Sequence, residues 1–388
     1  MLHHEKLNLK KIRIISAVSL LVGLSEAFFL YIMSSFFKLA SGTENVGVFY
    51  LIAYGVILII FLNLHKIVRK FGKSDVLVFS LVSKVAIITG LLFLPSGYLG
   101  ITLVILYLIF GNLEWVMLDI ILESYSIDNM SGRIRGTFLT IMNLGFLLGP
   151  FLSIEIFSKF QYFGVFLILL IINTAVLFIE TNIMERAGKN LRSDLSLVSI
   201  FRKIAKRENI LHIYLISFTL EFFYAVMVIY APIYLIDLGI SWKEIGIIFT
   251  IMLVPFVLFQ YPVGMLADKK LGEKEMLVGA VFLMGISTLA VYFINSKSIL
   301  VWSAVFFLTR VGASLIEILR DSYFYKRIDA SDVDLINIFR TARPGAYIVA
   351  SIVSALVIFF FSIKAVFVLL AITVFLALYP VFRLKDSK

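Results

Sequence analysis

Apolar residues run in twelve long stretches along this 388-residue chain, and short polar segments separate them. Each stretch is about 20 residues or longer, the length of helix that crosses ~30 Å of hydrocarbon. Because backbone polar groups inside a bilayer must be satisfied within the segment, we expect these stretches to be helices. The predicted spans are residues 12–37, 46–64, 76–94, 101–122, 134–157, 162–181, 210–236, 243–265, 275–294, 298–320, 336–361 and 363–382.

The composition supports a membrane protein. Hydrophobic residues make up 61% of the chain, charged residues only 15%, and the mean hydropathy is +1.01. A soluble domain of this length could not bury that much apolar surface. The basic start Lys6–Arg13 precedes an apolar run too long for a secretory signal, so we interpret it as an uncleaved first span. The sequence predicts a multi-pass protein of the cell (plasma or inner) membrane.

Lysine and arginine are distributed unevenly between the two sets of alternating loops. The loops and adjoining span ends of one set carry 26 of them, and those of the other set carry five; the remaining four, Lys84, Arg310, Arg340 and Arg343, lie within the predicted spans. Basic residues in short loops favour the cytoplasmic side, so both termini are predicted to be cytoplasmic. The net charge of +10 then reflects topology and contact with lipid headgroups, and it does not indicate a nucleic-acid partner. The chain has no cysteine, which excludes disulfides and thiolate metal sites.

One long polar segment, Asn182–Asn209, divides the predicted spans into six and six. We predict an N-terminal six-helix bundle over residues 1–182, a cytoplasmic linker over 183–208 and a C-terminal six-helix bundle over 209–388. Apolar residues alternate with lysine and arginine in the linker, which is typical of an amphipathic helix at the inner membrane interface. A simple charged tether explains the same pattern, so both interpretations stay open.

The two halves resemble each other at a nearly constant offset. Asp119–Tyr125 and Glu317–Tyr323 both read acid-x-x-x-acid-Ser-Tyr, 198 residues apart. Phe71–Val78 resembles Leu271–Val278 at an offset of 200, and Glu26 corresponds to Glu221 at an offset of 195. Matches in register predict a duplicated six-helix unit. The predicted fold class is an all-α integral membrane protein with twelve transmembrane helices in two pseudo-symmetric six-helix bundles.

A polar motif follows the eighth predicted span. Gly264, three residues, Asp268, Lys269 and then Gly272 resemble the loop signature of the major facilitator superfamily. The glycines are expected to allow close helix approach and a tight turn, and the aspartate to place an anion at a helix end. The equivalent loop of the first half departs from this pattern, with His65 in the first glycine position. The resemblance covers the whole chain, because that family is built from two six-helix halves.

The resemblance implies a gate on the cytoplasmic side. Asp268 is expected to face the start of the fifth span near Arg133 and Arg135, and Lys269 to reach acids of the tenth span. The other expected gate residues are Asp119, Glu123, Glu317, Asp321 and Arg340.

The fifth span carries a second resemblance. Gly136, Gly145 and Gly149-Pro150 have the spacing of the signature typical of antiporters of that family, although Ser153 and Ile154 replace its final glycine pair. Small residues at this spacing also permit close helix packing in any membrane protein. The direction of transport therefore stays open at this point.

Charged residues at membrane depth are the main functional signal. Glu26, Glu114, Glu221 and Arg310 lie in the first, fourth, seventh and tenth spans, and we expect the other eight spans to carry no such charge. Placing an ionised side chain at such a depth costs several kcal/mol of free energy unless the charge is paired or hydrated. The family resemblance implies that these four spans line a central cavity. We predict Glu26 and Glu221 as proton carriers and Glu114 with Arg310 as an orienting or substrate-binding pair; purely structural ion pairs are the alternative.

The sequence thus predicts a secondary transporter that moves a small solute by alternating access, in a proton-coupled efflux (antiport) mode. A proton-coupled nutrient importer is the alternative. The excess of acids over bases at depth favours a protonation role or a cationic substrate over an anionic one, and we predict a cationic or amphipathic solute. We predict a monomer without a cofactor. We also predict no enzymatic activity, because the metalloprotease motif His-Glu-x-x-His is missing and no histidine lies mid-span to activate Ser314. A membrane enzyme or a non-transporting scaffold stays the alternative of another class.

Overall fold

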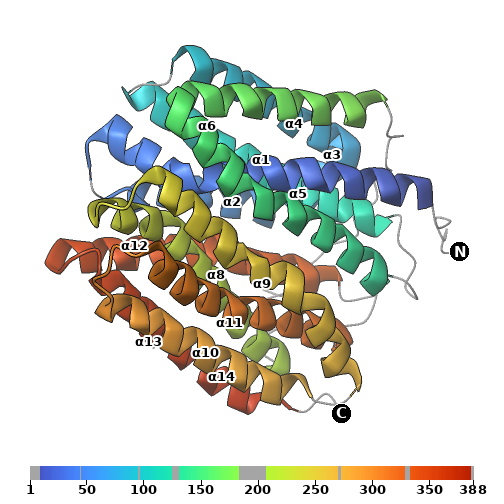
Figure 1. Ribbon diagram of the computed structural model, residues 1–388. Coiled ribbons are helices and arrows are strands. Elements are labelled where there is room, and N and C mark those ends of the chain that lie inside the picture. Colours follow the sequence, from blue (N-terminus) through green and yellow to red (C-terminus); the bar gives the residue numbers. More distant parts are fainter. Residues whose placement is uncertain are drawn as a thin grey trace, which may run out of the picture. The chain divides into compact units, whose positions relative to one another are not determined.

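The computed structural model in Figure 1 describes residues 9–43, 45–94, 97–124, 131–182, 207–269, 272–327 and 333–385. These residues form helices and no strand, which confirms the predicted all-helical class for this part of the chain. The predicted amphipathic helix falls on residues 183–206, outside the described residues, and stays a prediction.

The helices follow the predicted apolar stretches closely, because long runs of apolar residues between polar breaks leave no competing secondary structure in a bilayer. The N-terminal part contains α1 (Leu9–Ser41), α2 (Gly47–Leu62), α3 (Leu64–Phe71), α4 (Lys73–Phe93), α5 (Gly97–Ser124) and α6 (Ser131–Asn182). The C-terminal part contains α8 (Glu208–Asp237), α9 (Trp242–Lys269), α10 (Glu273–Phe293), α11 (Ile299–Lys326), α12 (Val333–Phe360), α13 (Ala365–Leu376) and α14 (Leu378–Arg383).

The described residues contain ten segments that are long and apolar enough to cross a membrane, or eleven if α2 and α3, which meet at a bend of 62°, count as one span. Helix α6 is much longer than a bilayer needs, and Gln161 interrupts it with φ 52° and ψ −152°. This break lies between the predicted spans 134–157 and 162–181. A multi-pass membrane protein is therefore established, whereas twelve crossings and cytoplasmic termini stay predictions.

Contacts between Cα atoms divide the chain into two compact units. The first contains α1 and α3 to α6, and the second contains α2 and α8 to α14. The predicted bundles were defined by position in the sequence, and that division stays a prediction. The contact division differs from it in one respect: α2, from the N-terminal half of the sequence, packs against α12 and groups with the second unit.

Two close approaches hold α2 in the second unit. The rings of Tyr54 and Tyr347 stack with centroids 4.0 Å apart and an interplanar angle of 26°. At Gly47, a Cβ atom would lie 2.6 Å from the Tyr230 hydroxyl oxygen and 3.2 Å from the Ser351 carbonyl oxygen. A glycine at the start of α2 therefore allows this helix to approach α8 and α12 closely.

The stacked pair gives a direct test of this packing. We expect Tyr54→Leu to lower the free energy of unfolding by about 1 kcal/mol, because an aromatic pair contributes roughly that much beyond its buried area. Thermal unfolding of the purified protein in detergent measures the effect. Tyr379→Leu is the matched control, since Tyr379 is 63% exposed. Equal unfolding temperatures for the two variants would contradict a stabilising role for the stack.

In the first unit, α1 packs along α6 at glycines of the fifth predicted span. A Cβ atom at Gly145 would lie 2.7 Å from the Leu24 backbone nitrogen, and one at Gly149 would lie 3.0 Å from the Ala27 carbonyl carbon. Pro150 is buried in the same helix. Gly136 lies in α6, but its surroundings fall outside the described side chains.

Candidate functional site: two buried ion-pair networks

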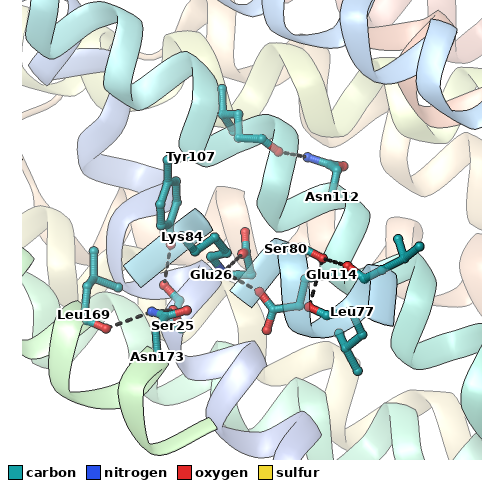
Figure 2. A network of polar contacts seen from close by, with 12 residues as sticks. Ser25, Glu26, Leu77, Ser80, Lys84, Tyr107, Asn112, Glu114, Leu169 and Asn173 are labelled. Carbon is teal, nitrogen blue, oxygen red and sulfur yellow. Dashed lines mark hydrogen bonds and ion pairs between the residues drawn. The ribbon is translucent and has the colours of Figure 1, made fainter. Parts of the chain in front are cut away.

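A lysine in the first unit lies between two glutamates. Lys84 Nζ, from α4, donates to Glu114 Oε2 of α5 at 2.6 Å and to Glu26 Oε1 of α1 at 3.0 Å, as Figure 2 shows. The Lys84 and Glu114 side chains are 0% and 1% exposed, and Glu26 is 13% exposed. Three helices thus bring two carboxylates to one ammonium group, and only Glu26 reaches an accessible space.

All three residues lie far from the helix ends. Lys84 is residue 12 of the 21 in α4, Glu26 is residue 18 of the 33 in α1, and Glu114 is residue 18 of the 28 in α5. At ~1.5 Å per residue, each is roughly 13 Å or more from either end of its helix. A charge at that depth is stable only when it is paired or hydrated, which explains why the three groups meet.

Neighbouring polar contacts hold these helices in place (Figure 2). The ring of Tyr107 lies under Lys84, with Nζ 5.0 Å from the ring centroid, and the Tyr107 hydroxyl donates to the Ser25 carbonyl oxygen at 3.4 Å. Asn173 Nδ2 of α6 donates to Ser25 Oγ at 2.8 Å. At Gly111, a Cβ atom would lie 2.7 Å from Glu26 Oε1, so a side chain there would displace the carboxylate.

The expectation that eight spans carry no deep charge is wrong, because Lys84 lies in the third predicted span. Sequence reasoning counted Lys84 among the residues within spans but gave it no role. It is the one charged residue among residues 76–94, and that isolation was the available signal. Lys84 also gives Glu114 a partner that the sequence analysis did not find, and the predicted pairing of Glu114 with Arg310 stays a prediction.

The second unit has its own network, centred on Arg320 of α11. Its Nη2 donates to Glu221 Oε1 of α8 at 3.2 Å, its Nη1 donates to Ser217 Oγ at 2.7 Å, and its Nε lies 3.4 Å from Asp321 Oδ1. The Arg320 and Glu221 side chains are 8% and 12% exposed. Arg320 ends the predicted span 298–320 and was counted with the adjoining loop in the charge distribution; the structure places it within α11 with a buried side chain.

A second acid of α11 joins two neighbouring helices. Glu317 Oε2 accepts hydrogen bonds from the Tyr224 hydroxyl of α8 at 3.3 Å and from Gln260 Nε2 of α9 at 3.2 Å. About two turns earlier in α11, the Arg310 guanidinium lies 4.8 Å from the ring centroid of Phe223 and 5.6 Å from that of Tyr224. The aromatic residues beside Glu221 therefore face an arginine.

The remaining predicted site residues are only partly placed. Asp119 is half-buried in α5, and Arg340 is half-buried in α12. Gly264 faces Ile318, where a Cβ atom would make an ordinary contact at 3.5 Å. Gly272 has φ −65° and ψ 156°, which any residue adopts, so the turn there does not need glycine. The side chains outside the described part are Asp268, Lys269, Glu123, Arg133 and Arg135, and their expected gate roles stay predictions.

Two positions that touch within the first unit have counterparts that touch within the second unit. Lys84 and Glu114 correspond to Met284 and Gly312 at the offsets of 200 and 198 found in the sequence. A Cβ atom at Gly312 would lie 2.6 Å from Met284 Cβ, so these positions also touch, between α10 and α11. The first unit therefore has a buried ion pair, Lys84 with Glu114, at the place where the second unit has an apolar contact between Met284 and Gly312.

The described residues bring together no group of three or more His, Cys, Asp or Glu side chains that could hold a metal ion. The networks instead pair carboxylates with lysine and arginine. Such groups can bind and release protons or bind a charged solute.

Comparison with known proteins agrees with this architecture. The family model described as Major Facilitator Superfamily matches residues 236–388. A solved structure of a variant of the nucleoside transporter NupG has the same fold, with a TM-score of 0.75 and 12% sequence identity. That similarity covers 96% of this chain and 99% of the other. No curated protein matches the sequence.

The family match carries the C-terminal part of the chain, and the shared fold extends over nearly all of it. Together with the ten or eleven apolar spans and the loop motif at Gly264 to Gly272, they agree with the resemblance to the Major Facilitator Superfamily and show its fold.

Proposed function

We propose that the protein is a secondary transporter of the cell membrane that moves a small cationic or amphipathic solute by alternating access, coupled to protons. The fold match to a transporter structure supports transport as the general activity. The proposal needs no cofactor and no enzymatic step, and it assigns the chemistry to ionisable side chains in the middle of the helices.

One observation carries proton coupling: two carboxylates share a single ammonium group at Lys84. One lysine neutralises one of the two negative charges, so the group as a whole retains an excess negative charge. A proton on Glu26, the more exposed of the two acids, would neutralise it without disturbing the bond between Lys84 and Glu114. Glu26 can therefore exchange a proton with an aqueous cavity.

Glu221 is the second candidate proton carrier. It is 12% exposed and shares Arg320 with Asp321, so again two carboxylates meet one cation. Glu317 of α11 is a third acid of the second unit, and it accepts hydrogen bonds from a hydroxyl and an amide. The remaining role predicted for Arg310 is binding or orienting the solute, beside the rings of Phe223 and Tyr224.

We propose efflux by exchange with protons as the direction. Its support is the antiporter-type spacing of Gly145 and Gly149-Pro150, residues that pack where α6 meets α1. Asp268, Lys269 and the arginines of the α6 start are the proposed cytoplasmic gate. Import by symport is the alternative outcome of the transport experiment.

The test measures flux in proteoliposomes with and without a pH gradient. A thermal-shift screen of organic cations, amphipathic amines and nucleosides first identifies a solute. We expect Glu26→Gln and Glu221→Gln to retain solute exchange and to lose accumulation driven by the gradient, because each amide cannot carry a proton. Glu155→Gln is the matched control, since this acid forms an exposed pair with Lys159 at 2.7 Å.

Accumulation at the wild-type level in both the Glu26→Gln and the Glu221→Gln proteins would contradict proton coupling at these acids. The sign of the gradient that drives uptake into the liposomes, with the orientation of the protein determined, decides between export and import.

A further inference from the structure

The Glu26–Lys84–Glu114 group already binds one ammonium ion, the one that the chain itself supplies. Lys84 Nζ lies 2.6 and 3.0 Å from two carboxylate oxygens and 5.0 Å from the centroid of the Tyr107 ring. Anionic oxygens on one side and an aromatic face on another are the groups that recognise organic ammonium ions. The chemistry of this place therefore suits a protonated amine.

The three side chains differ in how far an external cation could reach them. Glu114 and Lys84 are 1% and 0% exposed, whereas Glu26 is 13% exposed. Glu26 uses Oε1 for Lys84, and the absence of a side chain at Gly111 lets this carboxylate lie directly against α5. Of the three side chains Glu26 is therefore the one an external cation reaches most easily, and its bond to Lys84 is the longer of the two.

The charges favour an exchange at that acid. Two ionised carboxylates and one ammonium group carry a net negative charge, so one further positive charge would neutralise the group. Lys84 is tethered, so it competes with any free cation at a high effective concentration. If Lys84 stays on Glu114, an incoming ammonium group at Glu26 gives every carboxylate its own cation.

We propose that Glu26 and Glu114 form a binding site for one organic ammonium group, with Lys84 as its tethered competitor. An aliphatic amine in its protonated form binds Glu26, while Lys84 keeps its bond to Glu114 and its place over the Tyr107 ring. As a transport site this rests on the proposed function, because it names the class of solute. Binding itself requires neither flux nor proton coupling.

The experiment compares wild-type protein with Lys84→Met in detergent by thermal shift, with butylammonium chloride as the probe. Methionine keeps much of the side-chain volume and removes the competing charge. We expect half-maximal stabilisation at a concentration at least tenfold lower in Lys84→Met than in wild type. Butanol and sodium chloride at equal concentrations should give no such gain. Lys159→Met is the control, since Lys159 forms an exposed pair with Glu155.

Two further variants keep the outcome decisive. Lys84→Met/Glu114→Gln removes the second buried charge, so it should fold even if Lys84→Met does not, and it should show the same gain through Glu26. Lys84→Met/Glu26→Gln should lose the gain, and Glu26→Gln alone should bind butylammonium more weakly than wild type.

An unchanged butylammonium affinity in the folded protein that lacks Lys84, or no loss in Glu26→Gln, would overturn the proposal. An equal gain for sodium chloride would overturn the assignment to organic ammonium ions. The readout is independent of the flux experiment. Tight ammonium binding with no gradient-driven transport would leave this site in place and reject proton coupling, and the reverse result would do the opposite.

Discussion

Replacing Arg320 by methionine is expected to lower the free energy of unfolding by about 3–5 kcal/mol, the cost of removing one partner from a buried ion pair. Arg320 is 8% exposed and serves Glu221, Asp321 and Ser217 at once. Without the guanidinium, Glu221 and Asp321 each lose a contact with a cation, and Ser217 loses a hydrogen bond. Thermal or denaturant unfolding in a defined detergent measures the loss.

A second substitution separates charge from packing. If the uncompensated acid causes the loss, Arg320→Met/Glu221→Gln should recover a large part of it, because the amide does not carry the charge that arginine neutralised. Arg383→Met is the control, since Arg383 is an exposed arginine over the ring of Tyr379 in the same unit. An Arg320→Met protein as stable as Arg383→Met would show that the network contributes nothing to stability.

The two units neutralise their buried acids by different means. In the first, a flexible ammonium group at Lys84 bridges two helices that each supply one acid. In the second, the planar guanidinium of Arg320 has several fixed donors and engages a serine as well as acids. Arginine keeps its charge under all conditions, whereas lysine is a compact charge that a competing cation can replace. This difference supports placing the exchangeable cation at Lys84.

Hydropathy was sufficient to find most helices, because crossing a bilayer imposes one length and one composition. It also located Glu26 and Glu221 at depth, since rise per residue converts sequence position into height. It could not show which face of a helix a charge occupies. For that reason the Lys84 bonds to Glu26 and Glu114 were missed, and Arg320, near the end of an apolar run, was counted as a loop residue.

Glycine was a weaker guide in loops than in helices. Gly72 has φ 99°, a conformation that favours glycine, whereas Gly272, which belongs to the family motif, has φ −65°. The backbone conformation that requires glycine, which we expected at Gly272, is therefore found at Gly72, the corresponding position in the first half. Backbone angles depend on how each helix leaves the turn, and a residue pattern alone does not determine them.

Gly145→Ala is expected to lower the free energy of unfolding by about 3 kcal/mol, the upper part of the range for overpacking. The added Cβ atom would lie against the Leu20 carbonyl oxygen, 2.7 Å from the Leu24 nitrogen and 3.1 Å from the Gly23 carbonyl carbon. All three are backbone atoms of α1, so no rotamer change can make room, and α1 and α6 must separate. Small residues at helix interfaces in membranes exist to permit this approach.

The control distinguishes close packing from a general effect of glycine. Gly279 lies inside α10, and a Cβ atom there would meet nothing within 4 Å, so Gly279→Ala should leave the unfolding temperature unchanged or raise it slightly. Separation of α1 from α6 would also move Ser25 away from Asn173, and with it the helix that carries Glu26. Gly145→Ala should therefore weaken both stability and the Glu26 site, and a stable variant with normal solute exchange would reject the close contact.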